Sequence, residues 1–215
     1  MQKKTYAVLG LGRYGTAVAK ELVKSGMEVI AVDKNEQIVQ DSSAYLPICK
    51  CADITDHEVI SELGISNADV VIVAMASSLE GSILAITLCK EAGVKTVIAK
   101  CANETHRKIL KRVGADTVVF PENESGTRLA KNLLTSGFTD ILTLSDDLSL
   151  VELTARDEWV GKSLKELNLR KKYTVNVVAF RKNGKITAPV NPEELLDKDT
   201  EIIAIVNTAK LSKLK

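Results

Sequence analysis

The sequence predicts an α/β protein with a doubly wound parallel sheet, a crossover helix and a smaller α+β domain at the C-terminus. Three observations predict this fold class. Apolar segments alternate with amphipathic segments over residues 5–120, as expected for parallel strands that helices cover on both faces. The first apolar segment runs directly into the glycine-rich stretch GLGRYG, which in this setting is typical of a Rossmann-like sheet. After residue 140 strand-like segments predominate.

The first domain, residues 1–121, is predicted to alternate strands with helices. Its apolar segments are short enough for buried strands, and the segments between them carry apolar residues at helical spacing. Because crossovers between parallel strands are right-handed, these elements are expected to form one doubly wound sheet. Strands are expected at 5–10, 28–33, 46–51, 69–75, 96–100 and 116–120, and helices at 13–26, 35–45, 56–65, 79–93 and 103–115.

A helix at 121–137 is predicted to lead out of this domain, and residues 122–140 are assigned to this crossover helix and a linker. Proline stands at its start, acidic residues follow in the first turn, and leucines recur at helical spacing. The leucines Leu129, Leu133 and Leu134 could form a dimer contact or pack within the chain, and the sequence leaves both open.

The second domain, residues 141–215, is predicted to be mostly strand, so the boundary falls near 137–141. Strands are expected at 148–155, 174–187 and 200–206, with a short helix at 163–169. The Asn183-Gly184 pair predicts a hairpin inside 174–187, because both residues tolerate the positive φ of a type I′ turn.

Charge and composition argue against several classes of protein. The 29 Lys and Arg residues nearly balance 28 Asp and Glu, and aromatic residues make up 4%, so nucleic-acid binding is not expected. The longest apolar run, ADVVIVAMA, is shorter than a membrane span, and the N-terminus lacks a signal-peptide pattern. We therefore expect a cytoplasmic protein. Its four cysteines cluster in one half, in or beside apolar segments, and are expected to be reduced: Cys49, Cys51, Cys89 and Cys101.

The stretch GLGRYG matches the dinucleotide-binding fingerprint at Gly10, Gly12 and Gly15. These glycines would allow a tight turn, the approach of a pyrophosphate and close packing of helix on strand. Asp33 ends the second expected strand, where its carboxylate can accept both hydroxyls of an adenosine ribose. It also disfavours the 2′-phosphate of NADP, an effect that Lys34 softens. The alternative is a Rossmann-like sheet whose loop is empty.

Residues for catalysis are hard to find beside this loop. His57 and His106 fall on expected helices, where surface positions are favoured. Cys49 and Cys51 form a C-x-C pair that strand alternation explains better than a metal site. The sequence has no Tyr-x-x-x-Lys pair, nucleophile elbow or Walker loop. Arg13 could clamp a terminal phosphate or be a solvated charge on the helix. The pattern favours sensing over catalysis.

The segments VLGLGRYGTAVAKEL, VIAVDKN, CADITD, VGADTVVFPENESG and LSDDLSLVEL, in this order, resemble the regulator of potassium conductance (RCK) family. Within it they resemble the cytosolic regulatory subunit of Trk/Ktr-type potassium transporters, over the whole chain. The resemblance implies a non-enzymatic subunit that gates a membrane potassium-translocating partner according to bound ATP or ADP. It also implies a homodimer that assembles into an octameric ring, peripheral on the inner face of the cell membrane.

Two other functions share the fingerprint. An NAD(H)-binding regulator or a small NAD-dependent oxidoreductase would use NAD/NADH in place of ATP/ADP. A transcriptional or redox module would need a DNA-reading helix, which the neutral charge and the strand-rich C-terminal domain argue against.

The resemblance assigns a role to individual residues of the first domain. The family's adenine turn reads G-D-A-T, from which Ala52 and Ile54 depart, so the adenine contacts stay open. Glu122 matches a glutamate that helps to hold Mg²⁺ or Ca²⁺ beside the γ-phosphate, although it could simply favour the helix dipole. The implied nucleotide-binding residues are Gly10, Leu11, Gly12, Arg13, Tyr14, Gly15, Asp33, Lys34, Asn35, Ala52, Asp53, Ile54, Ala74, Met75, Ala76, Lys100 and Glu122.

In the second domain, LNLRKKYTVNVVAF and TAPVNPEE resemble segments that line a cyclic di-AMP site in some Gram-positive members of the family. The resemblance would place Arg170 at the phosphates and Pro189 nearby. Both residues have structural alternatives, because Arg170 could end a short helix and Pro189 a strand.

Overall fold

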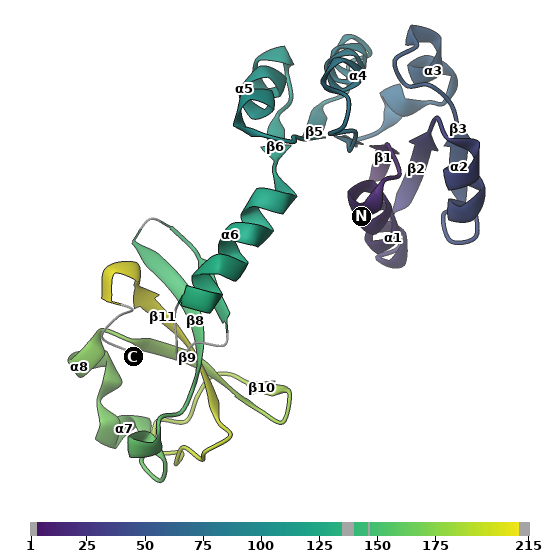
Figure 1. The fold of residues 1–215 in the computed structure, drawn as a ribbon. Helices are drawn as coiled ribbons and strands as arrows, with labels where there is room; N and C mark the ends of the chain where they lie inside the picture. Colours follow the sequence, from purple (N-terminus) through teal and green to yellow (C-terminus); the bar gives the residue numbers. More distant parts are fainter. Residues whose placement is uncertain (1–3, 135–139, 146, 211–215) are drawn as a thin grey trace. The chain divides into compact units, whose positions relative to one another are not determined.

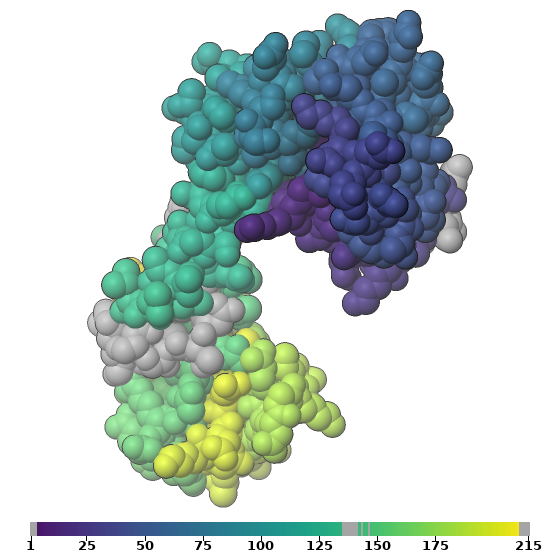
Figure 2. All heavy atoms as spheres, turned by 45° about the vertical axis from the view of Figure 1, so that its right-hand side comes forward, coloured from purple at the N-terminus to yellow at the C-terminus, as the bar shows by residue number. Residues whose placement is uncertain are grey.

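The structure, a computed structural model, describes residues 4–134, 140–145 and 147–210. It divides into two compact units, Met1–Pro121 and Glu122–Lys215, and each is described by itself. Figure 2 draws the atoms as spheres coloured along the sequence, from purple at the N-terminus to yellow at the C-terminus. The predicted boundary near 137–141 overlaps residues 135–139, which lie outside the described residues.

The first unit contains a parallel sheet in the order β3-β2-β1-β4-β5-β6 (Figure 1). Because β1 lies between β2 and β4, the chain winds outward from the centre in both directions. This order confirms the predicted doubly wound, Rossmann-like sheet. The strands are β1 (Thr5–Leu9), β2 (Glu28–Asp33), β3 (Ile48–Cys51), β4 (Val70–Val73), β5 (Thr96–Lys100) and β6 (Thr117–Val119).

Two apolar cores cover the two faces of this sheet. On one face, Ala19 and Leu46 pack with Val8 and Ala31 of the central strands. On the other, Ile86 and Leu110 pack with alternate residues of the same strands. The helices α1 (Arg13–Lys24) and α2 (Glu36–Ser42) therefore lie over one face, and α3 (His57–Glu62), α4 (Leu79–Glu91) and α5 (Glu104–Val113) lie over the other.

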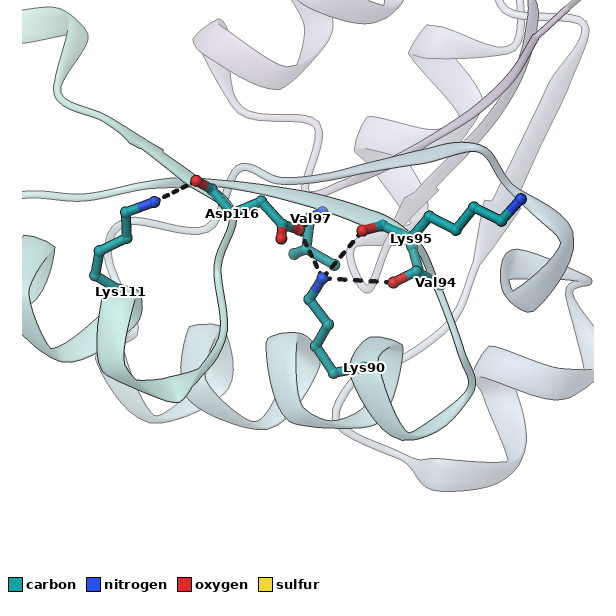
Figure 3. A network of polar contacts seen from close by, with 6 residues as sticks. All are labelled: Lys90, Val94, Lys95, Val97, Lys111 and Asp116. Carbon is teal, nitrogen blue, oxygen red and sulfur yellow. Dashed lines mark hydrogen bonds and ion pairs between the residues drawn. The ribbon is translucent and has the colours of Figure 1, made fainter.

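Polar contacts fix the start of β5 against the start of β6 (Figure 3). The carboxylate of Asp116 accepts from the Val97 N–H at 2.6 Å and from Lys90 Nζ at 2.6 Å. Lys90 also donates to the carbonyls of Val94 and Lys95, at 3.5 and 3.3 Å, and Lys111 donates to the Asp116 carbonyl. One aspartate thus ties two strands to the helices before them.

The helix α6 (Pro121–Leu134) opens the second unit. It starts at the predicted proline, while 135–137 of the predicted helix lie outside the described residues. Leu129, Leu133 and Leu134 are 60%, 77% and 80% exposed in the single chain. The described chain therefore does not bury the leucine face of this helix.

The second unit is an antiparallel sheet in the order β10-β9-β11-β8-β7. Its core packs Trp159, Leu167 and Phe180 against residues of β8 and β11. The hairpin at Asn183-Gly184 is confirmed, because both residues have positive φ, 50° and 76°, between paired strands. Its elements are β7 (Asp140–Thr143), β8 (Leu148–Thr154), η2 (Asp157–Trp159), α7 (Leu164–Leu167), α8 (Leu169–Tyr173), β9 (Asn176–Lys182), β10 (Lys185–Thr187) and β11 (Glu201–Asn207).

Candidate functional site

A cavity of about 470 Å³ opens at the carboxyl edge of the first sheet, where β1, β2, β3 and β4 end. Strand order reverses beside β1, and in open α/β sheets ligands bind in the crevice at this point. The size is in the usual range for a small-molecule site. The lining residues are Gly10, Gly12, Val32, Asp33, Lys34, Ile38, Ala52, Asp53, Ile54, Thr55, Ala74, Met75, Ser77, Ser78, Glu80, Gly81 and Leu84.

Asp33 holds the glycine loop in place. Its Oδ2 accepts from the Leu11 N–H at 2.7 Å, and its Oδ1 accepts from the Asn35 N–H at 2.9 Å. The Gly10 N–H donates to the Val32 carbonyl at 2.8 Å, which fixes the loop to the end of β2 a second time. A carboxylate offers about four lone-pair sites. Asp33 therefore keeps acceptor capacity for a hydroxyl of a ligand.

The three glycines of the loop differ in what a side chain at each position would meet. Gly10 has φ +95°, and a Cβ there would lie 2.7 Å from Met75 Cγ. A Cβ on Gly15 would lie 1.9 Å from the Gly10 carbonyl oxygen, so only glycine lets α1 pack this closely. A Cβ on Gly12 would meet nothing within 4 Å. Gly12 lines the cavity, so its bare backbone leaves room for a ligand there.

The N-terminus of α1 differs from those of its neighbours. Its N-cap is Gly12, without a side-chain cap, and its first turn carries no acid. The described helices α2 to α5 each have a side-chain cap and an acid in the first turn. The first amide groups of a helix and its dipole favour an anion. The N-terminus of α1 at the cavity thus keeps uncapped N–H groups and the positive end of the helix dipole, both of which favour a phosphate group.

An acidic wall faces part of the cavity. Asp53 Oδ1 accepts from the Thr55 N–H at 3.0 Å and from Thr55 Oγ1 at 2.7 Å. These hydrogen bonds, the backbone one first, hold the pKa of Asp53 below its usual value. Among the described lining residues, Asp33, Asp53 and Glu80 supply three carboxylates and Lys34 supplies one ammonium group. Apolar surface comes from Ile38, Ile54 and Leu84.

The structure brings nine of the predicted nucleotide-binding residues to the cavity lining: Gly10, Gly12, Asp33, Lys34, Ala52, Asp53, Ile54, Ala74 and Met75. Other predicted residues support the loop from outside. Leu11 is buried in the core but gives its N–H to Asp33. Gly15 packs under Gly10, and Asn35 caps α2 through the N–H groups of Gln37 and Ile38.

Four further predicted residues of the first unit lie outside the lining. Arg13 is exposed as the first residue of α1. Tyr14 and Lys100 lie near each other, with Lys100 Nζ 5.7 Å from the ring centroid of Tyr14. Ala76 is half-buried directly after Met75. The sequence predicts these residues in the loop or at strand ends, but it does not give the side-chain directions that decide which residues line a cavity.

The remaining predicted residues belong to the second unit. Glu122 is in the first turn of α6, and its role beside a γ-phosphate stays a prediction. Arg170 lines a separate cavity of about 350 Å³ with Thr174, Asn176 and Asn207. Pro189 is exposed and is not among the residues that line this cavity.

The lining also contains residues that the sequence analysis missed. They are Val32, Ile38, Thr55, Ser77, Ser78, Glu80, Gly81 and Leu84. Five of these come from the loop after β4 and the first turns of α4. Ser78 caps α4 by accepting from the Gly81 N–H at 3.0 Å. A serine directly before the helical segment, with Glu80 in the first turn, could have indicated this cap and with it the helix end at the edge of the site.

No catalytic or metal constellation stands out in the described part of the chain. His57 is exposed and His106 is half-buried, and neither lines the cavity. The four cysteines are free thiols, and burial raises the pKa of Cys89 to about 12. Within residues 4–134, 140–145 and 147–210, no three His, Cys, Asp or Glu residues are grouped as metal ligands would be. None of the described helices is long and apolar enough to span a membrane.

Comparison with known proteins agrees with this architecture. Residues 6–121 match the TrkA-N domain and residues 148–215 match the TrkA-C domain. The chain belongs to the TrkA family. Ktr system potassium uptake protein C of Bacillus subtilis is 35% identical over 213 residues, 99% of this chain and 96% of that protein. Ktr system potassium uptake protein A of Vibrio alginolyticus is 34% identical over 99% of this chain and 97% of its own.

Solved structures show the same fold for this TrkA-family chain. The GsuK channel matches with a TM-score of 0.72 at 17% identity, over 99% of this chain and 39% of the channel chain. The GsuK RCK domain matches with a TM-score of 0.68 at 17% identity, over 99% of this chain and 47% of that one. The resemblance to RCK proteins of Trk/Ktr-type potassium uptake systems is therefore confirmed.

Proposed function

We propose that this TrkA-family chain is the nucleotide-sensing regulatory subunit of a potassium-uptake system. It binds ADP or ATP in the cavity of its first unit and couples the bound nucleotide to ion flux through a membrane potassium-translocating partner. In this proposal it acts in the cytoplasm at the inner face of the membrane, as a homodimer that assembles into an octameric ring.

One observation carries this proposal: the hydrogen bonds of Asp33 hold a glycine loop whose uncapped helix end faces a cavity. The backbone at Gly12 would receive phosphate groups, and the remaining acceptor sites of Asp33 would receive ribose hydroxyls. Ile54 and Leu84 offer apolar contacts to a base, while the ionised Asp53 offers an acceptor for its amino group. Each part of an adenine nucleotide thus has a complementary surface.

A regulatory role fits this cavity better than the alternative of a small NAD-dependent oxidoreductase. Hydride transfer to or from a substrate needs a positioned proton donor or acceptor beside the nicotinamide. The imidazoles of His57 and His106 do not line the cavity. The lining carboxylates of Asp33 and Asp53 already accept hydrogen bonds within the loops that they hold. Regulation requires only that ATP and ADP bind the two states of the assembly with different affinity.

The charge of the cavity supports a role for a divalent cation. Three carboxylates in the described lining would repel a polyphosphate, and Lys34 offsets only one of them. Mg²⁺ or Ca²⁺ bound to phosphate oxygens would reduce this repulsion, because hard cations prefer oxygen ligands. Glu122 is our candidate for the carboxylate that completes this cation site.

Potassium flux in reconstituted liposomes tests the proposal. We expect the membrane subunit with the wild-type chain to give different flux in ATP and in ADP. Asp33→Asn keeps the shape of the side chain but removes its charge, so the loop loses charge-assisted hydrogen bonds worth about 1.5–3 kcal/mol each. This variant should bind both nucleotides at least about tenfold more weakly and show no nucleotide-dependent flux.

Asp41→Asn is the matched control. Asp41 is exposed on α2, outside the cavity, and accepts only a side-chain contact from Gln37 among the described interactions. It should keep both binding and regulation. Equal flux in ATP and ADP with the wild-type chain would reject the sensing role, even if both nucleotides bind.

The cavity of the second unit is our candidate for a second ligand site. Arg170 lines it together with Thr174, and Lys210 Nζ donates to Thr174 Oγ1 at 2.9 Å. The Arg170 guanidinium, with Lys210 held on the lining residue Thr174, and the apolar residues Val175 and Ile205 suit an anionic ligand with aromatic bases. Cyclic di-AMP is our candidate for this ligand.

A further inference from the structure

The short helix α8 lies between two residues with a left-handed backbone. Asn168 precedes the helix with φ 49°, and Thr174 follows it with φ 59°. The Thr174 N–H donates to the Arg170 carbonyl at 3.1 Å, which closes the last turn. Helices commonly end in this conformation, but the usual residue there is glycine or asparagine. The end of α8 therefore carries a residue that this conformation does not favour.

Threonine is strained in the left-handed region. Its branched Cβ crowds the backbone, so positive φ is unusual for such a residue, whereas asparagine adopts it readily. Of the three described non-glycine residues with positive φ, which are Asn168, Thr174 and Asn183, Thr174 is the β-branched one. Strain of this kind persists where the surrounding structure imposes it, and it gathers at ligand-binding sites. We therefore expect the Thr174 side chain to have a role that glycine could not fill.

The hydroxyl group of Thr174 holds a lysine beside the second cavity. Lys210 is half-buried, and its Nζ donates to Thr174 Oγ1 at 2.9 Å. Thr174 and Arg170 line the same cavity, whose described lining contains no Asp or Glu. A hydroxyl oxygen accepts a hydrogen bond without neutralising the ammonium charge, and two N–H groups of the ammonium stay available for a ligand. The contact thus preserves a positive charge at this cavity.

We propose that Thr174 is a positioning residue of the second cavity. Its left-handed backbone directs the hydroxyl to Lys210, and this contact holds the ammonium group as a second cation, besides Arg170, for the phosphate groups of an anionic ligand. The inference rests on the second ligand site of the proposed function. It adds Lys210 to the residues that bind the ligand, and it explains why a strained threonine ends α8.

Calorimetric titration of the full chain with cyclic di-AMP, together with the melting temperature, tests this role. In Thr174→Gly the relief of strain offsets the lost hydrogen bond and the greater freedom of the unfolded chain, so we expect a melting temperature close to that of wild type. The affinity should fall by about threefold to tenfold, the effect of one net hydrogen bond. Thr174→Ser keeps the hydroxyl and should bind within about twofold of wild type.

A double-mutant cycle shows whether Thr174 acts through Lys210. Lys210→Met removes a charged donor and should weaken the binding of cyclic di-AMP by about tenfold or more. In the Lys210→Met background, Thr174→Gly should weaken it by less than about twofold, because the hydroxyl no longer has an ammonium group to hold. Additive losses would overturn the inference, since they would mean that the two residues act independently.

Asn168→Gly is the matched control. It introduces glycine at the other left-handed end of α8, and Asn168 does not line the cavity, so the affinity for cyclic di-AMP should stay unchanged. Wild-type affinity in the folded Thr174→Gly chain would overturn the inference and leave the second site standing. Failure of wild type to bind cyclic di-AMP would reject the second site and this inference with it, while titration with ADP reports on the first site separately.

Discussion

Two aspartates show how a single carboxylate can organise a parallel sheet. Asp33 is the last residue of β2, and its carboxylate accepts from the Leu11 N–H at the carboxyl edge of the sheet. Asp116 precedes β6 and accepts from the Val97 N–H, where β5 and β6 begin. Both join segments that are distant in sequence. Asp33 does so at the cavity, whereas Asp116 does so through Lys90 and Lys111, away from it (Figure 3).

Asp116→Asn should lower stability without affecting nucleotide binding. The amide keeps the size of the side chain but loses the charge-assisted bonds to Lys90 and to the Val97 N–H. We expect a loss of about 1 kcal/mol, a modest figure because 44% of the Asp116 side chain is exposed. Calorimetry should show a melting temperature lower by about 2–4 °C.

This loss should depend on pH. The hydrogen bond from Lys90, first among the causes, holds the pKa of Asp116 below its usual 3.8. The unfolded chain therefore binds this proton at a higher pH than the folded chain does. The contribution is complete above the unfolded pKa and disappears as the pH falls through the folded pKa. Wild type and Asp116→Asn should thus have the same stability in strongly acidic solution.

Glu104→Gln is the control for both stability measurements. It removes an exposed helical ion pair with Arg107 and should change stability by less than about 0.5 kcal/mol.

At the scale of elements, the turn from β1 into α1 combines two separate requirements. Close packing requires Gly15, since a Cβ there would overlap the Gly10 carbonyl. Gly12 lines the cavity and has open space beside it, and in the proposed function a phosphate group occupies this space. The fingerprint is therefore expected to contain one residue needed for folding and another needed for the ligand, and the two can be separated by mutation.

Gly12→Ala should fold normally and bind ADP at least about tenfold more weakly, because its methyl group would occupy the phosphate position. Gly15→Ala should lower the melting temperature even without nucleotide, since the helix must move away from the strand. Gly126→Ala is the control, because a Cβ there meets nothing within 4 Å on α6, and alanine should stabilise the helix by about 0.5–1 kcal/mol. A Gly12→Ala chain that binds ADP like wild type would contradict the placement of the phosphates.

At the scale of the molecule, the two candidate sites belong to units with separate cores. The two core clusters of the first unit contain no residue beyond Phe120, and the core of the second unit lies within residues 151–206. The first cavity is lined by residues 10–84 and the second by residues 148–207. We therefore expect a substitution in the lining of one cavity to leave ligand binding at the other cavity unchanged.

Calorimetry of two variants should separate the sites. Arg170→Gln should lose affinity for cyclic di-AMP by about tenfold or more, because a charge-assisted contact to phosphate is removed, and should bind ADP normally. Asp33→Asn should show the reverse. Lys171→Gln is the control for the loss of one positive charge on α8, since Lys171 does not line the second cavity. Loss of ADP affinity in Arg170→Gln would show that the two sites are not independent.

The sequence by itself determined the first sheet, the glycine loop, Asp33 and the hairpin at Asn183-Gly184. These features depend on local chemistry: apolar periodicity, positive φ and a carboxylate at a strand end. It missed β7, which is short and acquires its place by pairing with β8. Strand pairing is a non-local contact, and a short segment carries too little local pattern to predict it.

Only the tertiary structure decided which side chains line the cavity. The predicted residues were neighbours of the loop in sequence or at strand ends, whereas Ser78, Glu80 and Leu84 reach the cavity because α4 starts at the same edge of the sheet. The structure also left Arg13 exposed and outside the cavity lining, and it placed the Met75 side chain between Gly10 and Gly81. Position along a strand or helix follows from periodicity, but the direction of a side chain depends on what packs against it, and that is settled only when distant segments meet.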